Sequence, residues 1–151
     1  MANAPSAAVQ RLVDVVAQLR NPATGCPWDL EQTHASLVPY VLEEAHEVAD
    51  AIRQGDDQHL KEELGDLLLQ VVLHAQIAGE EQRFDLNAIA DGISNKLIRR
   101  HPHVFGDAEA SSSDDVRRSW EAIKMEEQAA ILSGSTSPLS DRLRAKVRGL
   151  P

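Results

Sequence analysis

Apolar residues recur at the three- and four-residue spacing of an α-helix in five segments of the chain, and no segment alternates apolar and polar residues as a strand does. We therefore predict an all-α fold, a bundle of about five helices. Residues 21–29 contain two prolines and a glycine and predict a loop. Residues that typically begin or end helices predict where each helix lies. The first helix is expected from Ser6, its N-cap, to about residue 21, and the second from Pro39, in its first turn, to Gly55. The other three are expected from Asp56 or Asp57 to about Ala78, from Asp85 to His101, and from Asp114 or Asp115 to about Leu132.

The second and third of these helices carry the same pattern of carboxylates at an offset of 19 residues. In each helix the acids border the apolar stripe instead of lying opposite it, which draws them toward the seam between two packed helices. The short turn at Gly55 makes the two helices antiparallel neighbours, so that their acids can face each other. The residues of the pattern are Glu43, Glu44 and Glu47 in the first copy and Glu62, Glu63 and Asp66 in the second.

Crowded carboxylates at such a seam predict a metal site, because they repel one another unless a cation neutralises them. The candidate ligands are hard oxygens, which favour Mg²⁺, with Mn²⁺ as a substitute. Either helix alone would indicate only a charged surface, and the matched pair favours the metal. A di-iron site stays as an alternative, since Glu43-x-x-His46 matches its motif, whereas Glu31-x-x-His34 precedes the helix proper. Gly65 stands where the second acidic helix would need its histidine.

Basic and aromatic residues farther along suggest an anionic ligand with a flat ring. Lys96 and Arg100 lie one helical turn apart, so both can bind one polyphosphate, although they also suit the C-terminus of a helix. Trp120 could stack on a nucleobase or belong to the core. Additional candidates for these roles are Arg99, Lys124 and Trp28.

Composition narrows the class of protein. The 151 residues suit one domain, and 42% apolar with only 3% aromatic residues suits packed helices. A net charge of −9 argues against general affinity for nucleic acids. A single cysteine, Cys26, excludes an intramolecular disulfide and fits a reducing cytosol. We expect no membrane span and no signal peptide, and hence a cytoplasmic protein. Residues 133–151 predict a flexible linker and a basic tail.

The third helix has apolar residues around more than half of its circumference, more than one antiparallel neighbour covers. Examples are Leu67, Leu68, Val71 and Val72. We therefore expect the bundle to be completed by homo-oligomerisation, as a homodimer or a larger assembly.

Taken together, these motifs resemble the MazG nucleoside triphosphate pyrophosphohydrolases of the all-α NTP pyrophosphatase superfamily. The EExxE and ExxD signature of that family is matched by Glu43-Glu44-Ala-His-Glu47 and Glu63-Leu-Gly-Asp66. The resemblance extends over about residues 8–130, within an expected domain of residues 1–132, and includes the segments 26–34, 96–107 and 120–124.

The resemblance implies Mg²⁺-dependent hydrolysis of an NTP or dNTP between its α- and β-phosphates, giving NMP and pyrophosphate. It implies that Lys96 and Arg100 hold the triphosphate and that Trp120 stacks on the base. The implied metal ligands are Glu44, Glu47, Glu63 and Asp66. We expect broad base specificity. A nucleotide-binding or regulatory module without turnover is the other hypothesis.

Glu43 is a candidate general base, which would orient or deprotonate the attacking water, although an exposed acid is the simpler interpretation.

The best-known members of the family carry two such domains in tandem, whereas this sequence holds one. A natural single-domain protein and an N-terminal half of a tandem protein are both compatible with the sequence.

Overall fold

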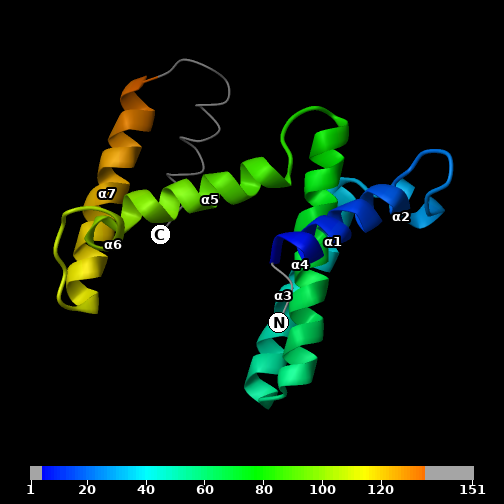
Figure 1. Cartoon of the computed structure of the whole chain (residues 1–151), viewed down its shortest axis with the longest axis horizontal. Coiled ribbons are helices and arrows are strands. Elements are labelled where there is room, and N and C mark those ends of the chain that lie inside the picture. The colour runs from blue at the N-terminus through cyan, green and yellow to red at the C-terminus, as the bar shows by residue number, and fades with distance from the viewer. Residues whose placement is uncertain (1–4, 135–151) are drawn as a thin grey trace. The chain divides into compact units, whose positions relative to one another are not determined.

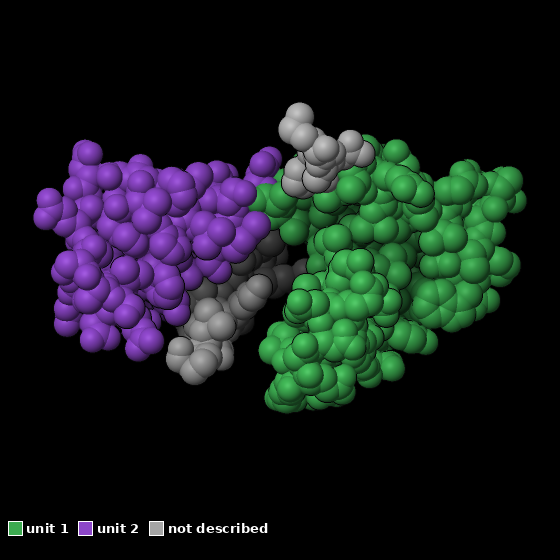
Figure 2. Space-filling view, turned by 60° about the horizontal axis from the view of Figure 1, so that its bottom comes forward, with its two compact units in different colours: residues 1–90 green, residues 91–151 purple. Residues whose placement is uncertain are grey.

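The computed structural model describes residues 5–134, and all regular secondary structure in that range is α-helical, as predicted (Figure 1). The chain divides into two units, residues 1–90 and 91–151 (Figure 2). The boundary lies inside the fifth helix. The described helices are α1 (Pro5–Leu19), α2 (Pro27–Glu31), α3 (His34–Gln54), α4 (Asp57–Glu80), α5 (Leu86–Arg100), α6 (Pro102–Phe105) and α7 (Ser113–Gly134).

Helix α3 begins with a capping box. The side chain of Thr33 accepts a hydrogen bond from the backbone N–H of Ser36 at 3.1 Å, and the Ser36 hydroxyl accepts one from the Thr33 N–H at 2.8 Å. The prediction that Pro39 lies in the first turn is wrong, because this box starts the helix one turn earlier and leaves Pro39 inside it.

The turn between α3 and α4 agrees with the prediction. Gly55 has φ +71°, the left-handed conformation that ends a helix and that glycine adopts without steric cost. Asp56 then caps α4 by accepting a hydrogen bond from the His59 N–H at 3.2 Å. So short a turn folds α3 and α4 back on each other as an antiparallel pair, and α1 packs against α4 (Figure 1).

The core of the first unit lies where α1, α3 and α4 meet. Its centre consists of apolar side chains that are at most 4% exposed, and Leu12, Val13, Leu69 and Leu86 pack around them. Burial of these side chains holds α1, α3 and α4 together, since removing each one from water contributes about 1.5–3 kcal/mol. The central residues are Val16, Leu37, Val72, Leu73 and Ile77.

Arg20, at the end of α1, joins three parts of the first unit. Its guanidinium donates to both carboxylate oxygens of Glu80, at 2.8 and 3.0 Å. It also donates to the backbone carbonyls of Asp29 and Gln32. Arg20 is only 9% exposed, so these partners replace the water that its charge loses on burial. The segment before α3 is thereby held to the end of α4.

The connection after α1 contains a tight turn and a short helix. Gly25 donates its N–H to the carbonyl of Asn21 at 2.8 Å, and a Cβ on Gly25 would lie 2.6 Å from that same oxygen. A larger residue therefore does not fit. The prediction of a loop throughout residues 21–29 is wrong in its last part, because Pro27 starts α2. Proline suits the first position of a helix, where its missing N–H has no partner to lose.

Several predicted helix ends are also wrong. Ser6 lies inside α1 and does not cap it. Helix α4 continues through Gly79 to Glu80, because Gly79 does not adopt the positive φ that would end the helix there. Asp85 accepts a hydrogen bond from the Ala88 N–H at 2.9 Å and caps α5 as expected. The short helix α6 was not predicted, and α7 begins at Ser113.

In the second unit, the end of α5 is joined to α7 by two arginines. Arg99 and Arg100 donate to the two oxygens of Glu127 at 2.6 and 3.0 Å. The hydrogen bond from Arg100, followed by that from Arg99, lowers the pKa of the Glu127 carboxyl. Most of the predicted linker and tail, residues 135–151, lies outside the described residues, whereas residues 133 and 134 belong to α7.

A pair of imidazoles connects α3 to α4 at the end of the hairpin away from Gly55. The Nδ1 atoms of His34 and His74 are 2.6 Å apart and their rings are parallel within 2°. Arg83 donates to Nε2 of His34, which places the proton of His34 on Nδ1, where it is donated to His74. Burial, followed by the nearby His34, lowers the pKa of His74.

We expect the free energy of unfolding to decrease as the pH falls below about 6.5, the ordinary pKa of histidine. A lowered pKa means that the unfolded chain binds this proton first, so the contribution of His74 is present above pH 6.5 and is lost as the pH falls. Urea unfolding at pH 7.5 and pH 5.0 measures the loss. The loss should be smaller in His74→Gln than in the unmodified chain, and unchanged in the control His46→Gln, an exposed histidine. An equal loss in all three proteins would contradict the assignment.

Candidate metal centre

The α3–α4 hairpin brings carboxylates from both predicted motifs together. Ligand oxygens of Glu44, Glu63 and Asp66 lie within 4.8 Å of one another. Glu63 and Asp66 are one turn apart on α4, and Glu44 reaches them from α3 because the helices are antiparallel neighbours. The two acidic motifs therefore face each other, as the sequence predicted.

Burial raises the pKa of the Glu44 carboxyl, and the charges of Asp66, Glu63 and Glu43 raise it further in that order. One oxygen, Oε2, is buried without a hydrogen-bond partner. A buried acceptor without a donor is costly, and a cation held between these three carboxylates would satisfy it and offset their repulsion. The donor set and the orphaned oxygen therefore fit a divalent metal ion.

Glu47, the fourth predicted ligand, belongs to a second group that includes a histidine. Ligand atoms of Glu47, His59 and Glu63 also lie within 4.8 Å of one another, and all three side chains are partly buried. The sequence interpretation missed His59. Its position four residues before Glu63 on the same helix was the available signal, since such residues share a face.

The remaining acidic and histidine candidates lie outside both groups. Glu43 is exposed, and its charge contributes to the raised pKa of Glu44. His46, part of the di-iron motif, is exposed, and His34 is paired with His74. The motif that suggested a di-iron site is therefore not brought together in the described residues.

The predicted phosphate- and base-binding residues lie in the second unit. Lys96 is exposed, and Arg100 is already paired with Glu127. Trp120 is partly buried, with its ring edge-on to His101 at a centroid distance of 5.2 Å and its Nε1 buried without a partner. Lys124 lies 3.9 Å from a carboxylate oxygen of Glu121.

Trp28, in the first unit, is the most exposed of the aromatic candidates. It belongs to α2, is 46% exposed and contacts Tyr40 edge-on at a centroid distance of 5.6 Å. Tyr40 is itself 38% exposed and lies one turn before Glu44 on α3. The structure thus offers an accessible ring surface on the same unit as the carboxylates.

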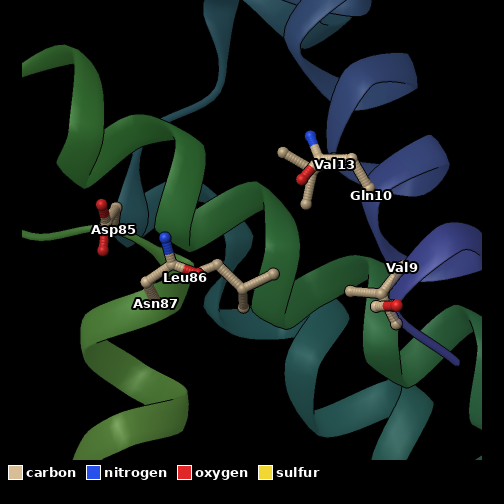
Figure 3. Close-up of a pocket in the computed structure, with 7 residues that line it drawn as sticks. Val9, Gln10, Val13, Asp85, Leu86 and Asn87 are labelled. Atoms are coloured by element: carbon tan, nitrogen blue, oxygen red, sulfur yellow. The ribbon is translucent and has the colours of Figure 1, made fainter.

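A hollow of about 400 Å³ in the first unit is separate from these groups (Figure 3). Its lining comes from α1, from the N-cap of α5 and from the first residues of α5. The carboxylate there, Asp85, is engaged in capping α5. None of the residues in the two metal-capable groups contributes to its wall.

None of the helices in the described part of the chain is long and apolar enough to cross a membrane.

Known proteins match this chain over the segment that carries the acidic motifs. Residues 32–105 match the model of the MazG nucleotide pyrophosphohydrolase domain. The chain is 55% identical over 121 residues to the nucleoside triphosphate pyrophosphohydrolase of Escherichia coli (strain K12), covering 80% of this chain and 46% of that protein. It is 47% identical over 133 residues to the nucleoside triphosphate pyrophosphohydrolase/pyrophosphatase MazG of Thermotoga maritima, covering 86% of this chain and 50% of that protein.

A solved structure shares the fold. The crystal structure of a mazG-related protein from Thermotoga maritima matches with a TM-score of 0.64 at 27% sequence identity, covering 77% of this chain and 98% of that one. The chain spans about half the length of these two curated relatives. The matched domain contains both acidic motifs and the hairpin that joins them, and the chain belongs to the MazG family.

Proposed function

We propose that this chain hydrolyses nucleoside triphosphates between the α- and β-phosphates, giving a nucleoside monophosphate and pyrophosphate. The convergence of Glu44, Glu63 and Asp66 from the two helices of the hairpin carries the proposal. The matching relatives named as nucleoside triphosphate pyrophosphohydrolases support it. Because the chain spans only part of those proteins, the activity of this chain is itself part of the proposal.

The four carboxylates Glu44, Glu47, Glu63 and Asp66 are proposed to hold Mg²⁺, the hard cation that oxygen ligands favour. When bound, the ion neutralises phosphate oxygens and lowers the pKa of a water molecule. Glu43 is the proposed general base. It is exposed one residue before Glu44, where it can accept a proton from the attacking water without being a ligand itself.

The substrate is proposed to be held by residues of the second unit, on the strength of the family motif. Lys96 and Arg100 bind the triphosphate, and Arg100 must exchange its ion pair with Glu127 for phosphate oxygens. Trp120 stacks on the base, and Arg99, Lys124 and Trp28 are the lower-ranked candidates. Stacking accepts every base, so broad specificity for NTPs and dNTPs is expected. The proposed location is the cytoplasm.

A coupled phosphate-release assay tests the activity. The purified chain is incubated with Mg²⁺ and each canonical NTP and dNTP, with and without added inorganic pyrophosphatase. We expect phosphate only when pyrophosphatase is present. Phosphate release without pyrophosphatase would indicate cleavage at the terminal phosphate and reject the proposal. No release in either condition, together with retained nucleotide binding, would favour a binding module without turnover.

Replacing Trp120 by Ala is expected to raise KM and leave kcat largely unchanged, as for a contact made equally in the ground and transition states. The loss should be about 1–3 kcal/mol in binding and larger for purines, whose rings offer more stacking area. Steady-state kinetics with ATP and CTP measure the difference. A variant that unfolds more easily and loses kcat for all substrates would show that Trp120 is a core residue, in keeping with its partly buried ring.

The first unit also exposes apolar surface that a second copy of the chain is proposed to cover. Leu64, Leu68 and Val71 are 48%, 40% and 38% exposed and form one stripe along α4, and Leu42 on α3 is 60% exposed. Light scattering at micromolar concentration should report at least twice the 16.5 kDa mass of one chain. Leu68→Lys should shift the protein toward the monomer. A 16.5 kDa particle in the unmodified chain would contradict the proposal.

A further inference from the structure

Two consecutive arginines at the end of α5 converge on a single carboxylate of α7. Nε of Arg99 lies 2.6 Å from Oε1 of Glu127, and Nη2 of Arg100 lies 3.0 Å from Oε2 of the same residue. Within the described residues, neither arginine forms an ion pair with a second carboxylate. Two positive charges therefore share one negative charge, and the cluster retains capacity for a further anion.

The hydrogen-bond donors of Arg100 also exceed the acceptors around it. Its Nε is buried without a partner, and the side chains of Arg100 and Glu127 are each only 21% exposed. By contrast, Arg20 donates from both Nε and Nη2 to the two oxygens of Glu80. A buried N–H without an acceptor is costly, and an oxyanion placed beside Arg100 would supply the missing oxygen.

The two arginines bind different oxygens of Glu127, so the carboxylate can leave Arg100 and stay on Arg99. A phosphate group can accept from Nε and Nη2 of Arg100 side by side, which is the paired geometry that a guanidinium forms with oxyanions. The exchange then replaces one hydrogen bond of Arg100 by two. Glu127 keeps a charged partner throughout, since the Arg99 side chain, 53% exposed, does not take part in the exchange.

We propose that Glu127 is an internal competitor of the substrate, which occupies the anion-binding donors of Arg100 in the absence of nucleotide and thereby sets the affinity for polyphosphate groups. The apparent affinity for a ligand falls with the fraction of molecules in which its site is free. The same competition lowers the affinity for the product pyrophosphate and favours its release. The inference rests on the proposed function in that the anion is taken to be a phosphate of the substrate.

Calorimetric titration of the full chain with inorganic tripolyphosphate, in the absence of divalent metal ions, is the first test. This probe has no base, and without a metal ion it does not bind to the carboxylates of the first unit. Glu127→Gln should bind it about 10-fold more tightly than the unmodified chain, because the competing carboxylate is gone. Glu126→Gln is the matched control, since it removes the same charge from the exposed neighbouring residue, and its affinity should hardly change. Unchanged or weaker binding in Glu127→Gln, or an equal gain in both variants, would overturn the proposal.

A second measurement uses the unmodified chain and does not depend on the folding of Glu127→Gln. The hydrogen bond from Arg100 is the first cause of the lowered pKa of the Glu127 carboxyl. Displacement from Arg100 should therefore raise that pKa when tripolyphosphate saturates the protein. Carbon-13 NMR of the glutamate carboxyls follows the titration, and Glu127→Asp, which keeps the charge, identifies the resonance. An unchanged pKa at saturation would overturn the proposal.

Steady-state kinetics separate this inference from the proposed function. If the chain hydrolyses nucleoside triphosphates, KM should fall about 10-fold in Glu127→Gln, an effect that loss of stability alone does not produce. Turnover with an unchanged KM in Glu127→Gln would overturn the inference and leave the proposed function standing. Tighter binding of tripolyphosphate by Glu127→Gln without turnover in either protein would refute the hydrolase and support the internal competitor.

Discussion

Replacing Asp66 by Asn should reduce Mg²⁺-dependent pyrophosphate release by more than about 100-fold, because even the partners of metal ligands contribute about 10–100-fold. Asn preserves the shape of the side chain and removes one negative charge. The charge of Asp66 is the largest electrostatic cause of the raised pKa of Glu44, after burial. The metal-free variant should therefore be as stable as the unmodified chain or more stable, since a repulsion is relieved. The same loss of turnover is expected for Glu47→Gln.

Glu62→Gln is the matched control for this prediction. Glu62 is an exposed acid on the same helix, next to Glu63, and it belongs to neither metal-capable group. Its variant should retain turnover, and circular dichroism should show unchanged helix content in both proteins. Full activity in Asp66→Asn would reject its assignment as a metal ligand. Equal losses in the two variants would point to net charge as the cause.

Replacing Arg20 by Met should lower the free energy of unfolding by about 1–3 kcal/mol. Methionine fills much of the same volume but cannot donate, so Glu80 and the carbonyls of Asp29 and Gln32 lose their partner. Leaving the two backbone carbonyls without a donor costs about this much, whereas Glu80, whose side chain is 36% exposed, regains water. Urea unfolding followed by circular dichroism measures the change.

Arg53→Met provides the comparison for Arg20. Arg53 is a surface arginine whose side chain is 75% exposed and pairs with Asp50 at 3.3 Å. Exposed pairs of this kind contribute about 0–1 kcal/mol, so its loss should hardly change the unfolding midpoint. Similar changes in both variants would show that the hydrogen bonds of Arg20 contribute no more to the free energy of unfolding than an exposed ion pair does.

The hairpin that presents the carboxylates was predictable because its signals are local. Gly55 and Asp56 mark the turn, and the apolar stripe of each helix determines which side its acids border. The sequence therefore predicted that Glu44 and Glu63 would meet. The roles of Glu43, Lys96, Arg100 and Trp120 in catalysis and substrate binding stay predictions.

Other features depend on tertiary contacts or on ambiguous local signals. Pro27 and Pro102 were interpreted as breaking or ending helices, yet each begins a short one, because proline both ends a preceding helix and suits a first position. The pairing of Arg20 with Glu80 joins residues 60 apart. Nδ1 of His59 contacts the side chain of Gln54 across the turn, and helical periodicity gives no signal for such a contact.

Hydrolysis in ¹⁸O-labelled water, followed by mass spectrometry of the products, tests the central claim most directly. Attack of water on the α-phosphorus of ATP places one ¹⁸O atom in the phosphate of AMP and leaves the released pyrophosphate unlabelled. We predict this result for the unmodified chain with Mg²⁺. Label in the pyrophosphate, or ADP and orthophosphate as products, would contradict the proposed reaction.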